Sequence, residues 1–471
     1  MGKGQLNTSE LLEMDRKYVW HPFTPMKAWM EKKDPPIIVR GEREFLFDSK
    51  GKSYIDAVSS LWCNIHGHCV PELDAAVQRQ LGCVAHSTLL GLCNQPSIEL
   101  AARLIDMAPR GLAKVFYSDD GSTAVEVSLK MAYQYWANQG RTDKRRFIAF
   151  GGAYHGDTLG AVSAGGIPAF HDVYQPLRFP VDHVQAPRLP PFSELNAAVG
   201  PCADNSSAPE DWEREIADTV MRYPGQHAAI IVEPVIQGAG GMIMHPAGTL
   251  TKLRRLANRH GMLLICDEVM TGFGRTGRMF ACDHEGVCPD LLCLSKGLTA
   301  GYMPLGATLT TQEIFDAFYA DPNEGKTFYH GHTFTGHPLA CAVGIASLDL
   351  FEKTDLLNHA REMADLLWDE LLALRGRPHV GDIRQTGLVS AVEIVRCVQS
   401  MQRFPWQWRV GGALCTAMRE HGVLLRPLGD VLVIMPPPAI RAENIKKIAR
   451  VVIECIDGEL SRIVAQQEAM T

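Results

Sequence analysis

The sequence predicts an α/β protein whose larger domain holds a mostly parallel sheet with helices on both faces. Short apolar strands alternate with helical segments from about residue 70 to residue 345, which is the pattern of strands joined by crossover helices. The 46% hydrophobic and 21% charged residues are typical of a soluble globular protein. With 471 residues, the chain has room for two or three domains and a large buried core.

The elements follow from local patterns. Residues 1–69 are expected to form an irregular, strand-rich segment of the smaller domain and of a ligand site, because "PPIIVRGEREFLFDSKGKSYIDAVSS" alternates apolar runs with turn residues. Residues 70–345 are expected to form the larger domain. Its predicted strands are 114–118, 146–150, 228–235, 262–269 and 291–296. The Pro-rich, polar stretch 180–225 is predicted to be an excursion within this domain.

Residues 346–471 are predicted to form a smaller α+β domain. Its first helix is indicated by apolar residues that repeat on one helical face and by Gly376, which suits the end of a helix. The repeating residues are Leu356, Ala360, Met363, Leu367, Leu371 and Leu374. Strand-like "GLVSAVEIV", another helix and "GDVLVIMPPP" follow.

Composition excludes several classes of function. The net charge is −7 and no basic block is present, which argues against nucleic acid or an anionic membrane as partner. No apolar run approaches the roughly 18–20 residues that a membrane span needs, and the first residues lack the apolar core of a signal peptide. The thirteen cysteines have no disulfide spacing and are expected to be reduced thiols. We therefore expect a cytoplasmic enzyme.

Chemistry-bearing residues follow four of the predicted strands. Strand 262–269 holds Asp267, and strand 291–296 ends in Lys296. The turn "SDDGST" (118–123) opens a helix, and "GGAYHGDT" (151–158) follows another strand. Ligands of open α/β sheets bind beyond the carboxyl ends of the strands, so we expect these four segments to meet at one site.

Together these residues suit pyridoxal 5′-phosphate (PLP). Lys296 supplies the amine that binds its aldehyde, and Asp267 supplies an acid beside the ring nitrogen. Gly121 and Ser122 at a helix N-terminus offer N–H groups, a hydroxyl and a favourable dipole for its phosphate, and Tyr154 can stack on the ring. Each residue alone is commonly a surface lysine, a helix cap or a structural loop residue, so the prediction rests on their joint placement.

The stretch His330–Pro338, "HGHTFTGHP", allows three interpretations: metal ligands, a catalytic relay or a turn. A zinc protein is the corresponding alternative, with Cys282, His284 and Cys288 in "CDHEGVC" as further ligands. Structural zinc favours paired cysteines separated by about two to four residues. The gap here is longer and no second pair is evident, so we predict no metal site.

The segment "CDEVMTGFGRTGRMFACDHEGVCPDLLCLSKGL" (266–298) resembles the signature of class III, fold-type I, PLP-dependent aminotransferases, and the resemblance extends over nearly the whole chain. It implies a homodimer whose two active sites lie at the subunit interface. It also implies that Lys296 is the covalent anchor of the cofactor and the proton carrier, with Asp267 as partner of the ring nitrogen. Transfer would proceed in two half-reactions, first with a donor amine and then with an acceptor.

Five further segments resemble the biotin-pathway branch of this family, whose members convert 8-amino-7-oxononanoate to 7,8-diaminononanoate. They are "YVWHPFTPM" (18–26), "SSLWCNIHGH" (59–68), "FYSDDGSTAVEVSLKMAYQYW" (116–136), "YHGDTLGAVS" (154–163) and "RPLGDVLVIMPPP" (426–438). By resemblance, Arg426 pairs with the acceptor carboxylate, for which a guanidinium is well shaped. Trp62 and Tyr154 would line the substrate channel. Arg275 would lie near the substrate, with a structural ion pair as the alternative.

The same resemblance implies that Thr333 binds the cofactor phosphate of the partner subunit, with Gly331 and His332 beside it. Four positions depart from the pattern common in members that use S-adenosylmethionine as donor. They are Phe23 in place of tyrosine, Leu61 in place of tryptophan, His332 in place of proline and Val433 in place of an aromatic residue. These departures favour lysine over S-adenosylmethionine as amino donor. A broad-specificity ω-amino-acid:pyruvate or diamine aminotransferase and an aminomutase are the other PLP-dependent alternatives.

Overall fold

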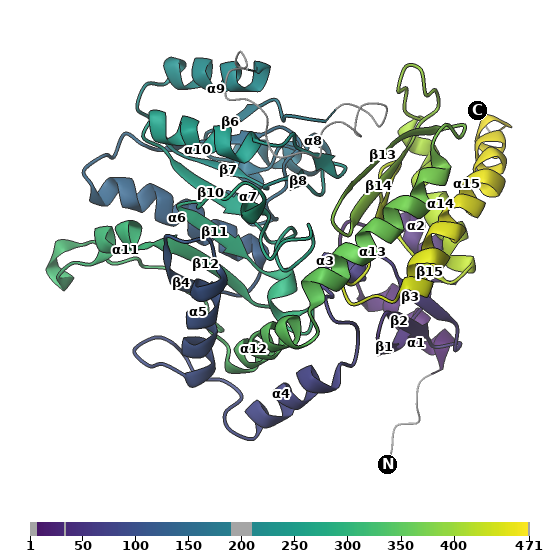
Figure 1. Cartoon of the computed structure of the whole chain (residues 1–471), viewed down its shortest axis with the longest axis horizontal. Coiled ribbons are helices and arrows are strands. Elements are labelled where there is room, and N and C mark those ends of the chain that lie inside the picture. Colours follow the sequence, from purple (N-terminus) through teal and green to yellow (C-terminus); the bar gives the residue numbers. More distant parts are fainter. Residues whose placement is uncertain (1–6, 33, 190–209, 470–471) are drawn as a thin grey trace.

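The structure is a computed structural model that describes residues 7–32, 34–189 and 210–469, and a seven-stranded sheet lies at its centre (Figure 1). The strands in spatial order are β4 (Leu112–Ser118), β12 (Gly306–Thr311), β11 (Leu291–Leu294), β10 (Leu263–Asp267), β7 (His227–Val232), β5 (Arg146–Phe150) and β6 (Val181–Val184). Only β12 runs antiparallel to its neighbours. The predicted mostly parallel sheet is confirmed.

Helices cover both faces of this sheet (Figure 1). One face packs on α4 (Pro71–Leu81), α5 (Gln95–Met107), α9 (Asp211–Arg222), α10 (Thr249–Arg259) and α12 (Pro338–Lys353), and the other on α6 (Gly121–Asn138), α7 (Leu159–Ala164) and α11 (Gln312–Phe318). Successive side chains of a strand point to opposite faces. Along β10, therefore, Leu264 and Cys266 join the first core, whereas Leu263 and Ile265 join the second.

The five predicted strands are present, but β6 and β12 were missing from the prediction. β12 has the sequence "GATLTT". It was not recognised as a buried strand because its threonines are polar. Inside the protein, Thr308 donates to the carbonyl of Ala124 (2.8 Å) and Thr310 to that of Asp290 (3.2 Å), so both hydroxyls are satisfied where they are buried. Of the stretch 180–225, β6 and α9 belong to the larger domain as predicted, and 190–209 lies outside the described residues.

The smaller domain has an antiparallel sheet under three helices. Its strands in spatial order are β13 (Val380–Thr386), β14 (Val389–Ile394), β17 (Val431–Ile434) and β16 (Arg426–Leu428), and its helices are α13 (Leu356–Leu371), α14 (Val410–Glu420) and α15 (Ala442–Ala469). The helix predicted from the apolar repeat is confirmed as α13. Leu374 lies in the 3₁₀ turn that follows it, and Gly376 then adopts a positive φ of 76°.

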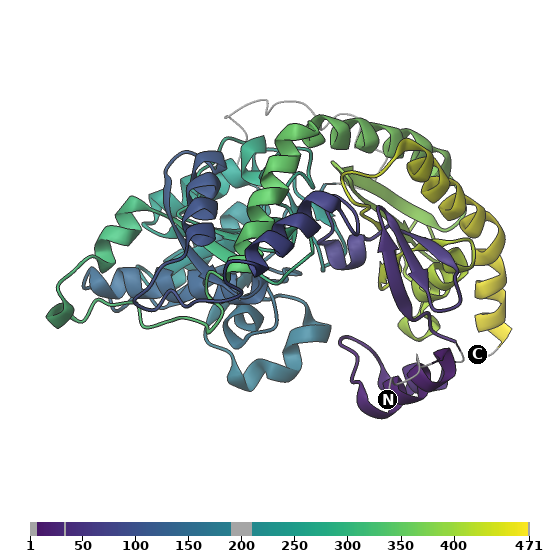
Figure 2. The same ribbon diagram turned by 90° about the horizontal axis from the view of Figure 1, so that it is seen from below.

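The N-terminal segment joins the C-terminal part of the chain. It contains α1 (Thr8–Tyr18), α2 (Met26–Glu31), β1 (Ile38–Glu42), β2 (Phe45–Asp48), β3 (Ser53–Asp56) and α3 (Ser59–Trp62). The short strand β15 (Val423–Leu424) pairs in parallel with β3, so the purple and yellow-green ends of the ribbon lie side by side in Figures 1 and 2. The division into 1–69, 70–345 and 346–471 stays a prediction, and α12 runs across residue 345.

A separate apolar cluster lies where the two domains meet. It joins Trp62 and Met270 to Val433 and to the two-stranded ribbon of β8 (Ile236–Gln237) and β9 (Ile243–Met244). This cluster seats the small sheet against the loops at the carboxyl ends of the large sheet. In the described part of the chain, no helix has the length and apolar character needed to cross a membrane.

Candidate active site

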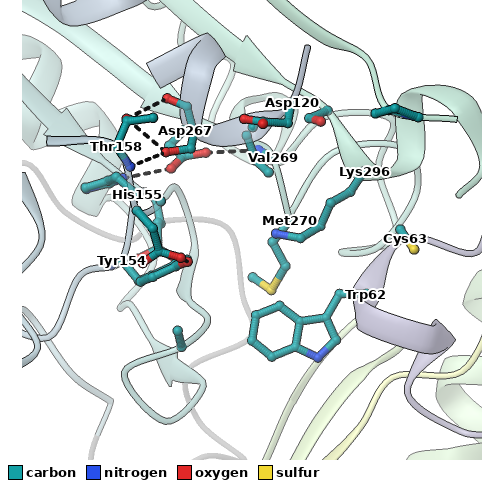
Figure 3. Close-up of a pocket in the computed structure, with 18 of the residues that line it drawn as sticks. Trp62, Cys63, Asp120, Tyr154, His155, Thr158, Asp267, Val269, Met270 and Lys296 are labelled. Atoms are coloured by element: carbon teal, nitrogen blue, oxygen red, sulfur yellow. Dashed lines mark hydrogen bonds and ion pairs between the residues drawn. The ribbon is translucent and has the colours of Figure 1, made fainter. Parts of the chain in front are cut away.

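A cavity of about 680 Å³ opens at the carboxyl ends of the central strands. It is lined by residues that follow β4, β5, β7, β10 and β11, together with Trp62 and Cys63 from the N-terminal segment. Figure 3 shows Asp267 and Tyr154 on one side of it, and Lys296 and Trp62 on the other. Six of the predicted site residues line this cavity: Trp62, Gly121, Ser122, Tyr154, Asp267 and Lys296.

Lys296 begins a tight turn directly after β11. Its backbone has a positive φ of 33°, and Ser295 before it donates to the carbonyl of Leu305 (2.7 Å). The amine points into the cavity and lies 5.5 Å from the centre of the Trp62 ring (Figure 3). Burial lowers the pKa of Lys296, while the negative charges of Asp267 and Glu233 act to raise it. A lysine with a lowered pKa is suited to nucleophilic attack and proton transfer.

Asp267 ends β10 and is 5% exposed. Its carboxylate accepts from His155 Nδ1 (2.7 Å) and from the backbone N–H of Val269 (3.0 Å). The pKa of His155 is raised: burial acts to lower it, but the hydrogen bond to Asp267 and the charges of Asp267 and Glu233 outweigh burial. His155 was not predicted as a site residue from the sequence, although it is next to Tyr154 in the glycine-rich loop after β5.

The start of α6 forms one wall of the cavity. The first N–H groups of a helix have no partner within it, and Asp120 caps only the N–H of Thr123 (2.8 Å). Gly156 has a φ of 121°, and a Cβ at this position would stand 2.2 Å from Ser122 Oγ. The two turns therefore pack closely because residue 156 is a glycine, and Ser122 Oγ accepts from the N–H of Thr158 (2.9 Å).

Tyr154, Phe23 and Arg426 form a row. The ring centres of Tyr154 and Phe23 are 6.4 Å apart, and the Arg426 guanidinium lies 5.9 Å from the Phe23 ring. Burial lowers the pKa of Arg426. Within the described ranges, no carboxylate forms an ion pair with Arg426, although its side chain is partly buried. A partly buried guanidinium without an internal partner is suited to a carboxylate of a ligand.

Of the remaining predicted residues, Trp62 is 6% exposed and packs with Met270 and Val433, whereas the neighbouring Leu61 is 46% exposed. Arg275 is fully buried and is absent from the cavity lining. It donates to Ser59 Oγ (3.1 Å) and to the carbonyls of Asn64 (2.6 Å) and Pro436 (2.9 Å), and burial lowers its pKa to about 10. Its predicted role in substrate binding stays a prediction.

Gly331, His332 and Thr333 also lie outside the lining of this cavity. Gly331 and Thr333 are exposed, and His332 Nδ1 lies 3.8 Å from a carboxylate oxygen of Asp119. His330 Nε2 is 3.3 Å from His332 Nε2. Among the described residues, no group of three or more His, Cys, Asp or Glu side chains could hold a metal ion. Instead, the Nε2 atom of His284 lies 3.0 Å from the carbonyl oxygen of Thr276.

The cavity fits PLP. A lysine amine, an acid bound to a buried imidazole, the open start of an 18-residue helix and a tyrosine ring all line one space. Lys296 would hold the aldehyde, Asp267 the ring nitrogen, and Gly121 and Ser122 the phosphate. Each of these assignments matches the functional group that the cofactor presents.

Comparisons with known proteins agree with this chemistry. The model of the aminotransferase class-III family matches residues 29–456. The adenosylmethionine-8-amino-7-oxononanoate aminotransferase of Geobacter sulfurreducens is 51% identical over 442 residues, which cover 93% of this chain and 95% of that protein. The same-named protein of Aquifex aeolicus is 45% identical over 440 residues, again 93% and 95% of the two chains.

Solved structures show the same fold. The crystal structure of adenosylmethionine-8-amino-7-oxononanoate aminotransferase from Methanocaldococcus jannaschii has a TM-score of 0.89 and 38% identity, and covers 96% of this chain and 99% of that one. An ω-transaminase from Pseudomonas jessenii, solved in complex with PMP, has a TM-score of 0.87 and 31% identity over 97% and 99% of the two chains. From its sequence, its fold and the arrangement of its cavity, this chain belongs to the class-III, PLP-dependent aminotransferase family.

Proposed function

We propose that this aminotransferase converts 8-amino-7-oxononanoate to 7,8-diaminononanoate in biotin synthesis. The observation that carries the proposal is Arg426, which is partly buried beside Phe23 and Tyr154 and has no ion-pair partner among the described residues. The acceptor is an apolar chain with a carboxylate at its far end. The names of relatives that are 51% and 45% identical support this acceptor.

The residues divide the work of the reaction. When bound, PLP supplies an aldehyde that carries an amino group between substrates and a ring that accepts an electron pair. In each half-reaction, Lys296 would carry one proton between the substrate carbon and the cofactor, in opposite directions in the two half-reactions. Asp267, whose carboxylate accepts from His155, would lie beside the ring nitrogen. Trp62 and Tyr154 shield the apolar chain of the substrate from water.

The second part of the proposal concerns which compound donates the amino group. The names of the relatives include adenosylmethionine, whereas the four departures at Phe23, Leu61, His332 and Val433 favour lysine. Three of these residues lie near the predicted substrate path: Phe23 beside Tyr154, Leu61 before Trp62, and Val433 in the cluster that contains Trp62. We propose lysine as donor, and S-adenosylmethionine is the competing outcome.

We also propose a homodimer with shared active sites in the cytoplasm. An apolar patch supports the dimer: Leu90 is 89% exposed, Leu92 64% and Phe334 51%. The segments that carry these residues touch, because the His86 ring lies 5.0 Å from that of Phe334. Thr333, which would reach the partner's cofactor, stands exposed at this patch.

A donor and acceptor assay tests the proposal. The PLP-loaded enzyme is mixed separately with lysine and with S-adenosylmethionine, and loss of the visible absorption band reports amino transfer from the donor. 8-Amino-7-oxononanoate is then added, and mass spectrometry should detect 7,8-diaminononanoate. Transfer from S-adenosylmethionine and none from lysine would reverse the donor assignment. Transfer from β-alanine or putrescine without amination of 8-amino-7-oxononanoate would replace the biotin-pathway function with that of a broad-specificity ω-aminotransferase.

A further inference from the structure

A buried carboxylate that none of the roles above uses lies in the wall of the cavity. Glu233 directly follows β7 and is 5% exposed. Its Oε1 accepts from the backbone N–H of Tyr154 (3.0 Å), and its Oε2 accepts from the backbone N–H of Gly238 (2.8 Å). One side chain thus joins the loop after β5 to the turn between β8 and β9, and both segments line the cavity.

Glu233 also belongs to a group of buried charges. The titratable groups that act on Glu233 are His155 after β5 and Asp267 at the end of β10. Those that act on Lys296 are Asp267, Glu233 and Cys63, which favour its charged form, and Arg275, which opposes it. His155 donates from Nδ1 to Asp267, and its Nε2 is buried without a hydrogen-bond partner in the described part of the chain. Two carboxylates therefore act on one imidazole and on one lysine.

We infer that Glu233 is a positioning residue of the cofactor cavity, which fixes the Tyr154 loop through its two backbone hydrogen bonds and completes a buried charge cluster with His155 and Asp267. The inference concerns the cofactor chemistry of the family and does not depend on the identity of the amino acceptor. It assigns two separable tasks to one side chain. The first task needs the reach of a glutamate, and the second needs its charge.

The charge has a predictable sign. A nearby negative charge favours the protonated form of an amine, and Glu233 acts in this direction on Lys296. Burial raises the pKa of Glu233 itself to about 7. The carboxylate therefore gains its charge near neutral pH and then strengthens the hold of Lys296 on its proton. Removing the charge should make the Lys296 nitrogen lose its proton at a lower pH.

The test compares Glu233→Gln with a matched control, Glu268→Gln. Glu268 is also buried and accepts from two backbone N–H groups, those of Ala281 (2.6 Å) and Cys282 (2.8 Å), and burial raises its pKa to about 7 as well. It does not line the cavity and does not act on Lys296. The readout is the pH midpoint of the visible spectrum of PLP-loaded protein without any substrate.

Glu233→Gln should lower this midpoint by about one unit, whereas Glu268→Gln should leave it unchanged. A third variant, Glu233→Asp, keeps the charge but is too short to reach both N–H groups. It should keep the midpoint of the unmodified protein and bind PLP more weakly in an equilibrium titration. Equal midpoints for Glu233→Gln and the unmodified protein would overturn the inference. The inference would also be overturned if Glu233→Asp lowered the pH midpoint by about one unit. This second comparison remains decisive if Glu233→Gln fails to fold.

Discussion

At the scale of single residues, burial favours the neutral forms of Lys296 and Glu233 in the cavity. It lowers the pKa of Lys296 and raises that of Glu233 to about 7, because each charged form loses water that the protein only partly replaces. The effect suits Lys296 for proton transfer at neutral pH. Arg426 stays charged despite its burial because the pKa of an arginine is far above neutral.

The residue-scale prediction concerns Arg426→Ala. Its charge-assisted bond to the acceptor carboxylate should be worth about 1.5–3 kcal/mol, so kcat/KM for 8-amino-7-oxononanoate should fall roughly 10- to 150-fold. In a two-half-reaction mechanism, kcat/KM of each substrate reports its own half-reaction, so the donor value should change little. Arg403→Ala, which removes an exposed arginine of the smaller domain, is the control. Equal losses for donor and acceptor would exclude the carboxylate role.

At the scale of elements, the site depends on two turns that touch. The start of α6 and the turn after β5 approach so closely that Ser122 accepts from the N–H of Thr158 (2.9 Å), and Gly156 leaves the space in which Ser122 lies. Either turn alone is an ordinary capped helix start or glycine loop. Their contact brings Gly121 and Ser122, the predicted phosphate-binding residues, into the same cavity as Tyr154 and His155.

The element-scale prediction is Gly156→Ala, compared with Gly140→Ala. Both glycines have positive φ, 121° and 77°, but nothing lies within 4 Å of a Cβ at position 140. Gly140→Ala should cost only the backbone strain, about 1 kcal/mol of unfolding free energy. Gly156→Ala should cost more than about 2 kcal/mol because its Cβ also collides with Ser122, and it should weaken PLP binding. Denaturant unfolding and a PLP titration measure both effects. Equal costs would show that the two turns separate freely.

At the scale of the whole molecule, distant parts of the chain converge on one loop. Arg275, in the loop after β10, donates to Ser59 and Asn64 of the N-terminal segment and to Pro436 near the C-terminal helix. The apolar cluster of Trp62, Met270 and Val433 joins the same three regions. Trp62 and Met270, which both line the cavity, are therefore more than 150 positions apart in the sequence, and Val433 belongs to the same apolar cluster.

The whole-molecule prediction concerns assembly. Light scattering should give twice the chain mass of 51.9 kDa. Leu90→Asp places a charge in the exposed apolar patch and should raise the dimer dissociation constant at least about tenfold. Met221→Asp alters an apolar residue on α9 that is 68% exposed, and it serves as the control. A monomeric unmodified protein, or equal effects of the two variants, would contradict the proposed interface.

Local patterns were sufficient for much of the fold. The apolar repeat defined α13, and the apolar runs located five strands of the large sheet. The threonine-rich strand β12 was not predicted, because the hydrogen bonds that allow its burial are made to Ala124 and Asp290, which lie elsewhere in the sequence. The parallel pair of β15 with β3 also left no local signal, because it joins residues 423–424 to residues 55–56.

The sequence by itself determined the family, the cofactor and the positions of Lys296 and Asp267, because these depend on motifs at strand ends that any sheet of this topology brings together. Only the tertiary structure decided that His155 and Glu233 share the cavity with them and that Arg426 has no ion-pair partner in the described chain. The physical reason is that burial and hydrogen-bond partners are properties of packing. A glutamate after a strand, such as Glu233 or Glu268, has the same local sequence signal whether it faces the cofactor cavity or the core.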